Sequence, residues 1–272
     1  MMSAYDVGGA LAAYLVSLPA LTFVLENAYS PQKQERMWAR HYERLTFQKY
    51  VSLAEFKKYG LKGFDGRTSR AFSSAVVVHN AALAVFSAYL FFGSIQVSFQ
   101  MFANQGFGSL CDPWTWDHYY IDYWATLFYW SKYYEFLDTW VIIAKSDRYG
   151  KRAKPSLLQV YHHCGIVVCT WATTVNRAPW AIYTVALNSG VHTFMYSYFL
   201  ARCLGFGGKM AKYVTTIQLT QFVVGLAMGL YSYSCSNGEL QQVCVVYLVY
   251  VVGLLVLFSD LFRKKYTSKQ KI

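Results

Sequence analysis

Long apolar runs recur along this chain, and short polar or basic connections separate them. A membrane-spanning helix needs about 20 largely apolar residues, and seven stretches reach about that length. They are residues 7–25, 71–95, 119–144, 156–174, 180–201, 213–234 and 240–262. The pattern therefore predicts an all-α integral membrane protein with seven transmembrane helices.

Composition supports the same fold class. Of the 272 residues, 55% are apolar and 14% are charged, whereas about a quarter of a soluble chain is charged. Aromatic residues reach 19%, and the 24 tyrosines suit a protein that meets two membrane–water interfaces. The chain has no internal repeat or inter-domain linker, so we expect one membrane-embedded domain over residues 1–272.

Basic residues are concentrated in alternate connections, which lie on the same side of the predicted spans. Residues 27–70, 145–155, 202–212 and the tail 263–272 hold ten, five, three and five of the 25 Lys and Arg residues. The positive-inside rule places these connections in the cytosol, which leaves the N-terminus lumenal or extracellular and the C-terminus cytosolic. The net charge of +11 then favours a membrane surface or an anionic small molecule over nucleic acid as a partner.

Two further features concern the connections. Residues 27–70 mix apolar and basic side chains, which is compatible with a helix lying in the cytosolic interface or with a solvated loop. The six cysteines form no CxxC pair, so the sequence supports no zinc or redox motif. Cys111 and Cys235 both fall in non-cytosolic connections. An oxidising lumen would allow a disulfide there, and we predict this bond.

Polar residues inside the spans are costly in hydrocarbon and mark candidate chemistry. In the third predicted span, Lys132, Glu135, Asp138 and Thr139 share one helical face. We expect Lys132 to neutralise Glu135 and Asp138 to orient another group. The same residues could instead form an ion-pair ladder that only holds the bundle together.

Three other spans carry polar residues at comparable depth. At about 1.5 Å per residue, the helices bring these side chains into one layer in the cytosolic half of the membrane. Such a layer below an apolar chamber suits a ligand with a charged head and a hydrocarbon tail. The residues are Gln159 with the imidazole pair His162 and His163, then Asn188, His192 and Tyr196 at a four-residue spacing, and Gln218 and Gln221.

With these four motifs, the chain resembles the very-long-chain fatty-acid elongases, the ELO family. KxxExxDT is read as Lys132, Glu135, Asp138 and Thr139; the histidine box as Gln159, His162 and His163; NxxxHxxMY as Asn188, His192, Met195 and Tyr196; and TxxQxxQ as Thr215, Gln218 and Gln221. The resemblance implies six helices around a narrow acyl tunnel open to the cytosol, a seventh helix outside them, and a disulfide between the second and sixth connections.

The resemblance also implies a reaction. A fatty acyl-CoA condenses with malonyl-CoA to a 3-oxoacyl-CoA, with release of CO2 and CoA, in the endoplasmic reticulum membrane. His162 would take the acyl group as an acyl-imidazole, His192 would serve the second half-reaction, and His163 would support its neighbour, with Asp138 as a candidate hydrogen-bond partner. Lys132, Glu135, Tyr196 and Gln159 are then expected in substrate binding, and Asn188, Gln218 and Gln221 as donors to oxyanions.

Substrate and partners follow from the same resemblance. Many family members have His at the position of Gln159, and the Gln form is similar to the branch that elongates polyunsaturated chains; saturated or monounsaturated acyl-CoA is the alternative. Neither a permanently bound cofactor nor a metal is expected. The implied partners are membrane lipid and the reductases and dehydratase of the elongation cycle, and a homodimer is left open.

Three other classes of protein compete with this interpretation. A membrane di-iron desaturase also uses HxxHH or QxxHH boxes but needs about eight histidines, and this chain has six. A condensing enzyme of the Cys–His type would use Cys164 beside the imidazole pair. A lipid transporter or scaffold would need a polar path through the whole membrane, whereas the predicted polar layer occupies one half.

Overall fold

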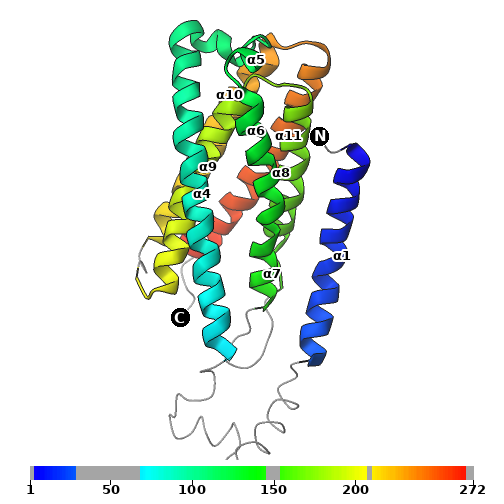
Figure 1. Ribbon diagram of the computed structural model, residues 1–272, viewed down its shortest axis with the longest axis vertical. Helices are drawn as coiled ribbons and strands as arrows, with labels where there is room; N and C mark the ends of the chain where they lie inside the picture. The colour runs from blue at the N-terminus through cyan, green and yellow to red at the C-terminus, as the bar shows by residue number, and fades with distance from the viewer. Residues whose placement is uncertain (1–2, 29–67, 145–153, 207–209, 268–272) are drawn as a thin grey trace, which may run out of the picture. The chain divides into compact units, whose positions relative to one another are not determined.

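The computed structural model describes residues 3–28, 68–144, 154–206 and 210–267, and long helices dominate these ranges (Figure 1). The all-α fold class is thereby confirmed for the described part of the chain, and helices occupy all seven ranges of the apolar pattern. The elements in chain order are α1 (Ala4–Ala28), α4 (Thr68–Gln105), η1 (Gly106–Leu110), α5 (Thr115–His118), α6 (Ile121–Tyr134), α7 (Phe136–Ala144), α8 (Leu157–Val175), α9 (Ala181–Cys203), α10 (Ala211–Cys235), α11 (Gly238–Phe262) and the π-helical turn η2 (Arg263–Thr267).

Contacts divide the chain into two compact units. The larger unit contains Met1–Val7, Ala75–Phe136 and Ser156–Ile272, and the smaller one contains Gly8–Ser74 and Leu137–Pro155. Within the larger unit, α6 packs against α8 and α9, α8 packs against α11, and α10 packs against both α9 and α11. All three imidazoles of the predicted site belong to this larger unit.

In the described part of the chain, four helical stretches are long and apolar enough to cross a membrane. They are Ala4–Val24, Ser74–Leu110, Ala211–Cys235 and Gly238–Thr267, so the chain is a multi-pass integral membrane protein. Of the other helices, α6 and α7 have 14 and 9 residues and are too short to span a membrane alone, whereas α8 and α9 are long enough but carry the polar residues His162, His163, Asn188 and His192. Polar side chains that face one another within a bundle lower the apolarity of a helix without exposing charge to lipid.

Two predicted boundaries were wrong. The second span was expected to end near residue 95, but α4 continues to Gln105 because the sequence contains no helix-breaking residue there. The third span is not one continuous helix. It begins at Ile121, is interrupted at Glu135 and resumes as α7, so Glu135 is the C-cap of α6 and Asp138 lies in the first turn of α7.

Local sequence explains where α8 begins and ends. The Ser156 side chain accepts a hydrogen bond of 3.1 Å from the backbone N–H of Gln159, which caps the helix N-terminus. At the other end, Arg177 adopts a left-handed φ of 50°, and the N–H of Ala178 bonds the carbonyl of Thr173 at 2.9 Å, as at many helix C-termini. Both ends of α8, the helix that carries His162 and His163, are therefore defined by local contacts.

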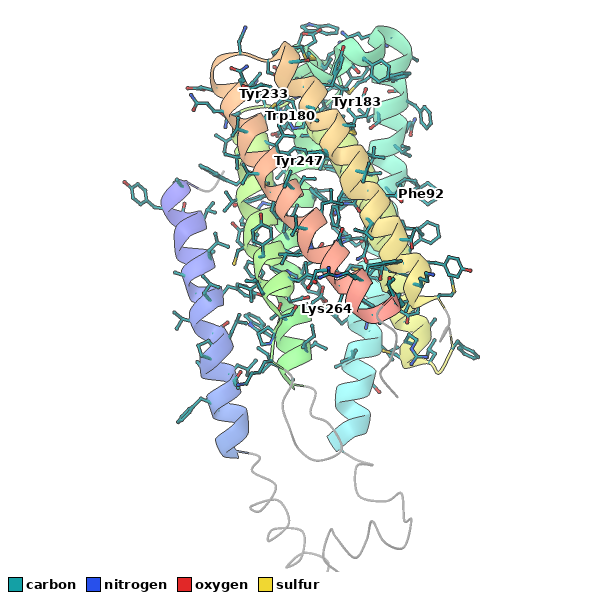
Figure 2. The ribbon with its side chains drawn as sticks, turned by 180° about the vertical axis from the view of Figure 1, so that it is seen from behind. Phe92, Trp180, Tyr183, Tyr233, Tyr247 and Lys264 are labelled. Carbon is teal, nitrogen blue, oxygen red and sulfur yellow. A yellow bond between two sulfur atoms is a disulfide. The ribbon has the colours of Figure 1, made fainter. Side chains whose placement is uncertain are left out.

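One end of the larger unit is held by a disulfide and by aromatic packing. Cys111 is bonded to Cys235, with the two Cα atoms 5.9 Å apart, which ties the segment after η1 to the C-terminus of α10. Nearby, the hydroxyls of Ser109 and Tyr183 are 2.6 Å apart. Figure 2 shows Tyr183 at this end and Lys264 towards the other end of the unit.

The smaller unit pairs α1 with α7. The hydroxyls of Tyr14 and Thr139 are 2.8 Å apart and buried, and the indole N–H of Trp140 donates to Ser17 at 3.0 Å. Thr139, one of the motif residues, therefore has a structural contact with α1. The predicted interfacial helix between α1 and α4 falls mostly on residues 29–67, outside the described residues.

Candidate active site

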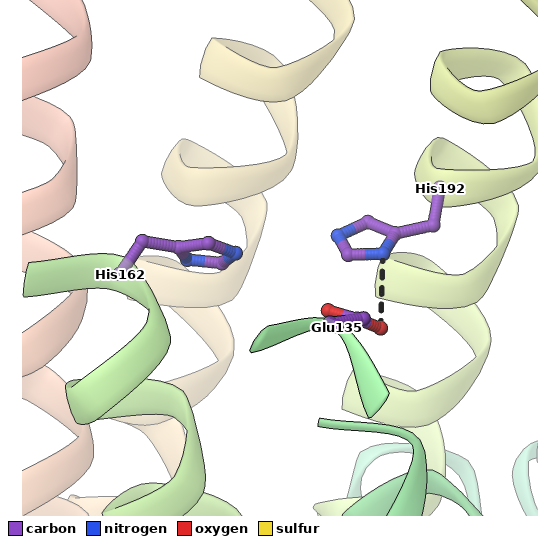
Figure 3. Close-up of side chains that lie close together, drawn as sticks. All are labelled: Glu135, His162 and His192. Carbon is purple, nitrogen blue, oxygen red and sulfur yellow. Dashed lines mark ion pairs between the residues drawn. The ribbon is translucent and has the colours of Figure 1, made fainter. Parts of the chain in front are cut away.

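Two imidazoles from different helices face each other in the larger unit. His162 projects from α8 and His192 from α9, with their ring centroids 6.3 Å apart. Figure 3 shows both rings pointing inward, with the Glu135 carboxylate beside His192. One ligand atom from each of these three side chains lies within 4.8 Å of the others. The structure thus brings together residues that are 27 to 57 positions apart in the sequence.

Glu135 is the charged centre of this cluster. Its Oε1 accepts a hydrogen bond of 2.7 Å from the Lys132 ammonium and lies 3.5 Å from Nδ1 of His192. Glu135 is 2% exposed and Lys132 is 1% exposed, and a buried carboxylate requires such compensation. The break between α6 and α7 occurs at this residue. The carboxylate lies beside Nδ1 of His192, and the other nitrogen of that ring faces His162 (Figure 3).

The Lys132 ammonium also orients Asn188. It donates a second hydrogen bond, of 3.2 Å, to Oδ1 of that amide. Because a lysine ammonium is only a donor, the Asn188 carbonyl must face Lys132, and the amide NH2 is then the end that can donate to a ligand. Asn188 is buried on α9 one turn before His192.

Tyr250 is a site residue that the sequence analysis missed. Its hydroxyl lies 2.9 Å from Nδ1 of His162 and donates to the backbone carbonyl of the same residue at 3.2 Å. Tyr250 stands in the middle of α11, in an apolar run without a recognisable motif. Gly165, three residues after His162, allows another helix to approach closely, but which side chain fills that space, here the Tyr250 ring, depends on tertiary packing.

His163 has a different partner from its neighbour. Its Nε2 lies 2.7 Å from Nε2 of Gln159, one turn earlier on α8. An amide NH2 only donates, so the His163 Nε2 accepts this bond, which requires a neutral ring. The rings of His162 and His163 are 5.3 Å apart. Among the described contacts, Gln159 therefore donates its hydrogen bond to His163.

The remaining predicted residues are arranged around this centre or away from it. Tyr196 is buried and makes an edge contact with His192 at 5.6 Å. Gln218 of α10 donates to Sδ of Met195 at 3.3 Å, and Gln221 is half-buried about one turn further along α10. Asp138 lies on α7 in the smaller unit, so its predicted support of His163 stays a prediction.

The cluster also contains a donor set that metals use. Two His and one carboxylate, Glu135 with His162 and His192, are the ligand types of non-haem iron sites. However, the Lys132 ammonium sits 2.7 Å from the same carboxylate and would repel a cation bound there. Tyr250 similarly engages Nδ1 of His162. The described contacts thus fit an internally paired cluster better than a metal centre.

The fold and the site define a class of protein, namely a multi-pass helical membrane protein with a buried cluster of imidazole, carboxylate and ammonium groups. Comparison with known sequences identifies the class more closely. Residues 44–272 match the ELO family, described as the GNS1/SUR4 family. The chain therefore belongs to this family of very-long-chain fatty-acid elongases.

Individual relatives support the family assignment. The chain is 31% identical over 225 residues to fatty acid elongase 1 of Trypanosoma brucei brucei, covering 78% of this chain and 72% of the relative. It is 28% identical to long chain fatty acid elongase 2 of Caenorhabditis elegans, over 78% of this chain and 79% of the relative. It is also 28% identical to human very long chain fatty acid elongase 6, over 72% and 74% of the two chains.

Proposed function

We propose that this protein catalyses the condensing step of fatty-acid elongation, in which an acyl-CoA and malonyl-CoA give a 3-oxoacyl-CoA, CO2 and CoA. The observation that carries the proposal is the pair of facing imidazoles, His162 and His192, 6.3 Å apart in a chain of the elongase family. A neutral imidazole is both a competent nucleophile and a base near pH 7.

In the first half-reaction, His162 accepts the acyl group. Its Nε2 lone pair attacks the thioester carbonyl, the C–S bond breaks, and CoA leaves as a thiolate that takes up a proton. Loss of one proton from the ring gives a neutral acyl-imidazole, so the step is balanced. The amide NH2 of Asn188, which the Lys132 contact turns towards a ligand, is a candidate donor to the developing oxyanion.

In the second half-reaction, malonyl-CoA supplies the carbon nucleophile. Loss of CO2 leaves an enolate of acetyl-CoA, which attacks the acyl carbonyl; the C–N bond breaks, and the departing His162 ring takes up one proton from solvent. Nδ1 of His192 lies 3.5 Å from Oε1 of Glu135. We therefore assign to the other nitrogen of that ring the role of binding the malonyl group or moving a proton. Gln218 and Gln221 are further candidates for binding it.

The membrane arrangement that we propose has seven spans, with six around an acyl tunnel that opens to the cytosol. The basic connections would then face the cytosol and bind the CoA phosphates, while the Cys111–Cys235 end would be lumenal, where disulfides persist. The proposed location is the endoplasmic reticulum, beside the reductases and dehydratase that complete the cycle.

For the substrate we propose a long, polyunsaturated acyl-CoA. The support is Gln159, which matches the Gln form of the histidine box and contacts His163 at 2.7 Å. Saturated and monounsaturated acyl-CoAs are the alternatives. Purified protein offered each acyl-CoA in turn with labelled malonyl-CoA should make labelled 3-oxoacyl product fastest from polyunsaturated chains, and equal or lower rates with those chains would reject this substrate class.

Replacement of His162 tests the reaction itself. His162→Ala should abolish labelled 3-oxoacyl-CoA, because the acyl acceptor is lost, whereas Cys164→Ala should retain the parental rate. Cys164 is the matched control because it lies two residues away on α8 and would be the nucleophile of a Cys–His enzyme. Full product formation by His162→Ala would refute the proposal.

A metal-dependent oxygenase is a second candidate, because two imidazoles and one carboxylate lie within 4.8 Å. Elemental analysis of the purified protein separates the two functions. We expect iron, manganese and zinc well below one equivalent, unchanged by His192→Ala. One equivalent of iron that His192→Ala removes would favour the oxygenase.

A further inference from the structure

The Tyr250 hydroxyl makes two contacts with one residue on the neighbouring helix. It lies 2.9 Å from the His162 ring nitrogen Nδ1 and 3.2 Å from the His162 backbone oxygen. A phenol has one hydrogen to donate and lone pairs to accept with. The backbone carbonyl can only accept, so a bond between these oxygens requires the hydrogen to come from Tyr250.

The direction of the Tyr250 hydrogen determines whether Nδ1 of His162 donates or accepts. Because the phenol hydrogen is directed at the carbonyl, the contact with Nδ1 is satisfied when the ring nitrogen carries the proton and donates it to the phenol oxygen. In a neutral imidazole, a hydrogen bond at one ring nitrogen determines which of the two nitrogens carries the proton. A proton on Nδ1 leaves the lone pair on Nε2, the outer nitrogen of a ring that points towards His192 (Figure 3).

Packing holds the phenol in this position. Gly165 lies under the Tyr250 ring, and a β-carbon there would overlap the ring carbons. In return, the hydroxyl of Tyr161 lies over Gly253 and donates to the backbone oxygen of Tyr250 at 3.3 Å, with the two tyrosine rings stacked at 5.8 Å. Each of the two helices therefore packs a tyrosine against a glycine of the other.

We propose that Tyr250 is a positioning residue that holds His162 in the tautomer protonated on Nδ1, so that Nε2 is the nucleophile. The proposal rests on the proposed acyl transfer to His162. In the acyl-imidazolium that forms first, the Nδ1 proton continues to donate to the Tyr250 oxygen. The Nδ1 proton then leaves the ring, and the CoA thiolate takes up one proton, so the charges balance.

The test compares two phenylalanine variants at the same helix interface. Tyr250→Phe removes the hydroxyl that touches the His162 ring, and Tyr161→Phe removes one that touches only backbone oxygens of α11 among the described contacts. Both keep their rings and hence their packing over glycine. Each purified variant is mixed with acyl-CoA alone, and the rate of the first stoichiometric release of CoA is measured with a thiol reagent.

We expect Tyr250→Phe to slow this release by about 100-fold or more at saturating acyl-CoA, since loss of the group that fixes a catalytic histidine tautomer can cost up to about 10⁴-fold, with little change in KM. Tyr161→Phe should stay within about threefold of the parent. The proposal is overturned if Tyr250→Phe also stays in that range, or if both variants lose the same rate. If the parent itself releases no stoichiometric CoA, the acyl-enzyme of the proposed function fails instead.

A second readout does not depend on activity. In protein labelled with 15N-histidine, the ring nitrogen shifts of His162, assigned by their loss in His162→Ala, distinguish the two neutral tautomers. The parent and Tyr161→Phe should show the proton on Nδ1, and Tyr250→Phe should show it moved towards Nε2. A parent ring protonated on Nε2 would contradict the proposal even if Tyr250→Phe were slow.

Discussion

At the residue scale, the site depends on one carboxylate that serves two partners. Oε1 of Glu135 lies 2.7 Å from the Lys132 ammonium, which it neutralises, and 3.5 Å from Nδ1 of His192. The sequence predicted the first contact from the spacing of the two residues on a helix. It did not predict the second, because the contact between α9 and the break after α6 depends on tertiary packing. Tyr250 was missed for the same reason.

Removing the lysine should expose the cost of the buried carboxylate. Lys132→Met leaves the Glu135 charge uncompensated, and loss of one partner of a buried pair costs about 3–5 kcal/mol. We expect that loss in the free energy of unfolding in detergent. The double variant Lys132→Met with Glu135→Gln should recover most of the stability but not the activity, since the carboxylate on His192 is gone.

An exposed ion pair gives the matched control for this experiment. Arg177 and Asp117 lie 3.0 Å apart with side chains 63% and 76% exposed, and such pairs contribute little. Arg177→Met should therefore leave stability nearly unchanged. Equal losses for Lys132→Met and Arg177→Met would show that the buried pair has no special role.

At the element scale, close approach of α8 and α11 places the nucleophile. Gly165 and Gly253 each admit a tyrosine of the other helix, and the same helix α11 inserts Tyr247 over Gly225 and Gly229 of α10. In the sequence, these glycines looked like ordinary small residues of apolar spans. Their function depends on which helices are neighbours, and one chain's apolar pattern does not contain that information.

The two glycines should respond differently to a methyl group. In Gly165→Ala the new methyl meets the body of the Tyr250 ring, which must move away from His162, so CoA release should fall by about tenfold or more. In Gly253→Ala it meets the hydroxyl and outer ring of Tyr161, the movable end of the side chain, and the effect should be smaller. Single-turnover CoA release measures both. The reverse order of effects would contradict this account of the interface.

At the scale of the whole molecule, the apolar pattern predicted the existence of the helices better than it predicted where each helix begins and ends. Seven ranges were helical as expected, but α4 ended ten residues beyond the predicted limit, and the third span was interrupted at Glu135. Hydropathy reports contact with lipid, so it does not distinguish a helix that continues beyond the membrane from one that ends at its surface.

The disulfide provides a prediction at this scale. Cys111→Ser should lower the thermal stability of the purified protein by an amount typical of a lost disulfide, about 2–5 kcal/mol, because the bond closes a sequence separation of 124 residues. The site is formed by other contacts, so the rate of product formation at low temperature should change little. Loss of activity without loss of stability would contradict this separation of roles.

The central claim is that His162 carries the acyl group, and intact-protein mass spectrometry tests it directly. The parent, Cys164→Ala and His162→Ala proteins are mixed rapidly with acyl-CoA alone, without malonyl-CoA, and their masses are recorded at once. We expect a mass increase of one acyl group in the parent and in Cys164→Ala, and none in His162→Ala. An adduct that persists in His162→Ala and disappears in Cys164→Ala would contradict it.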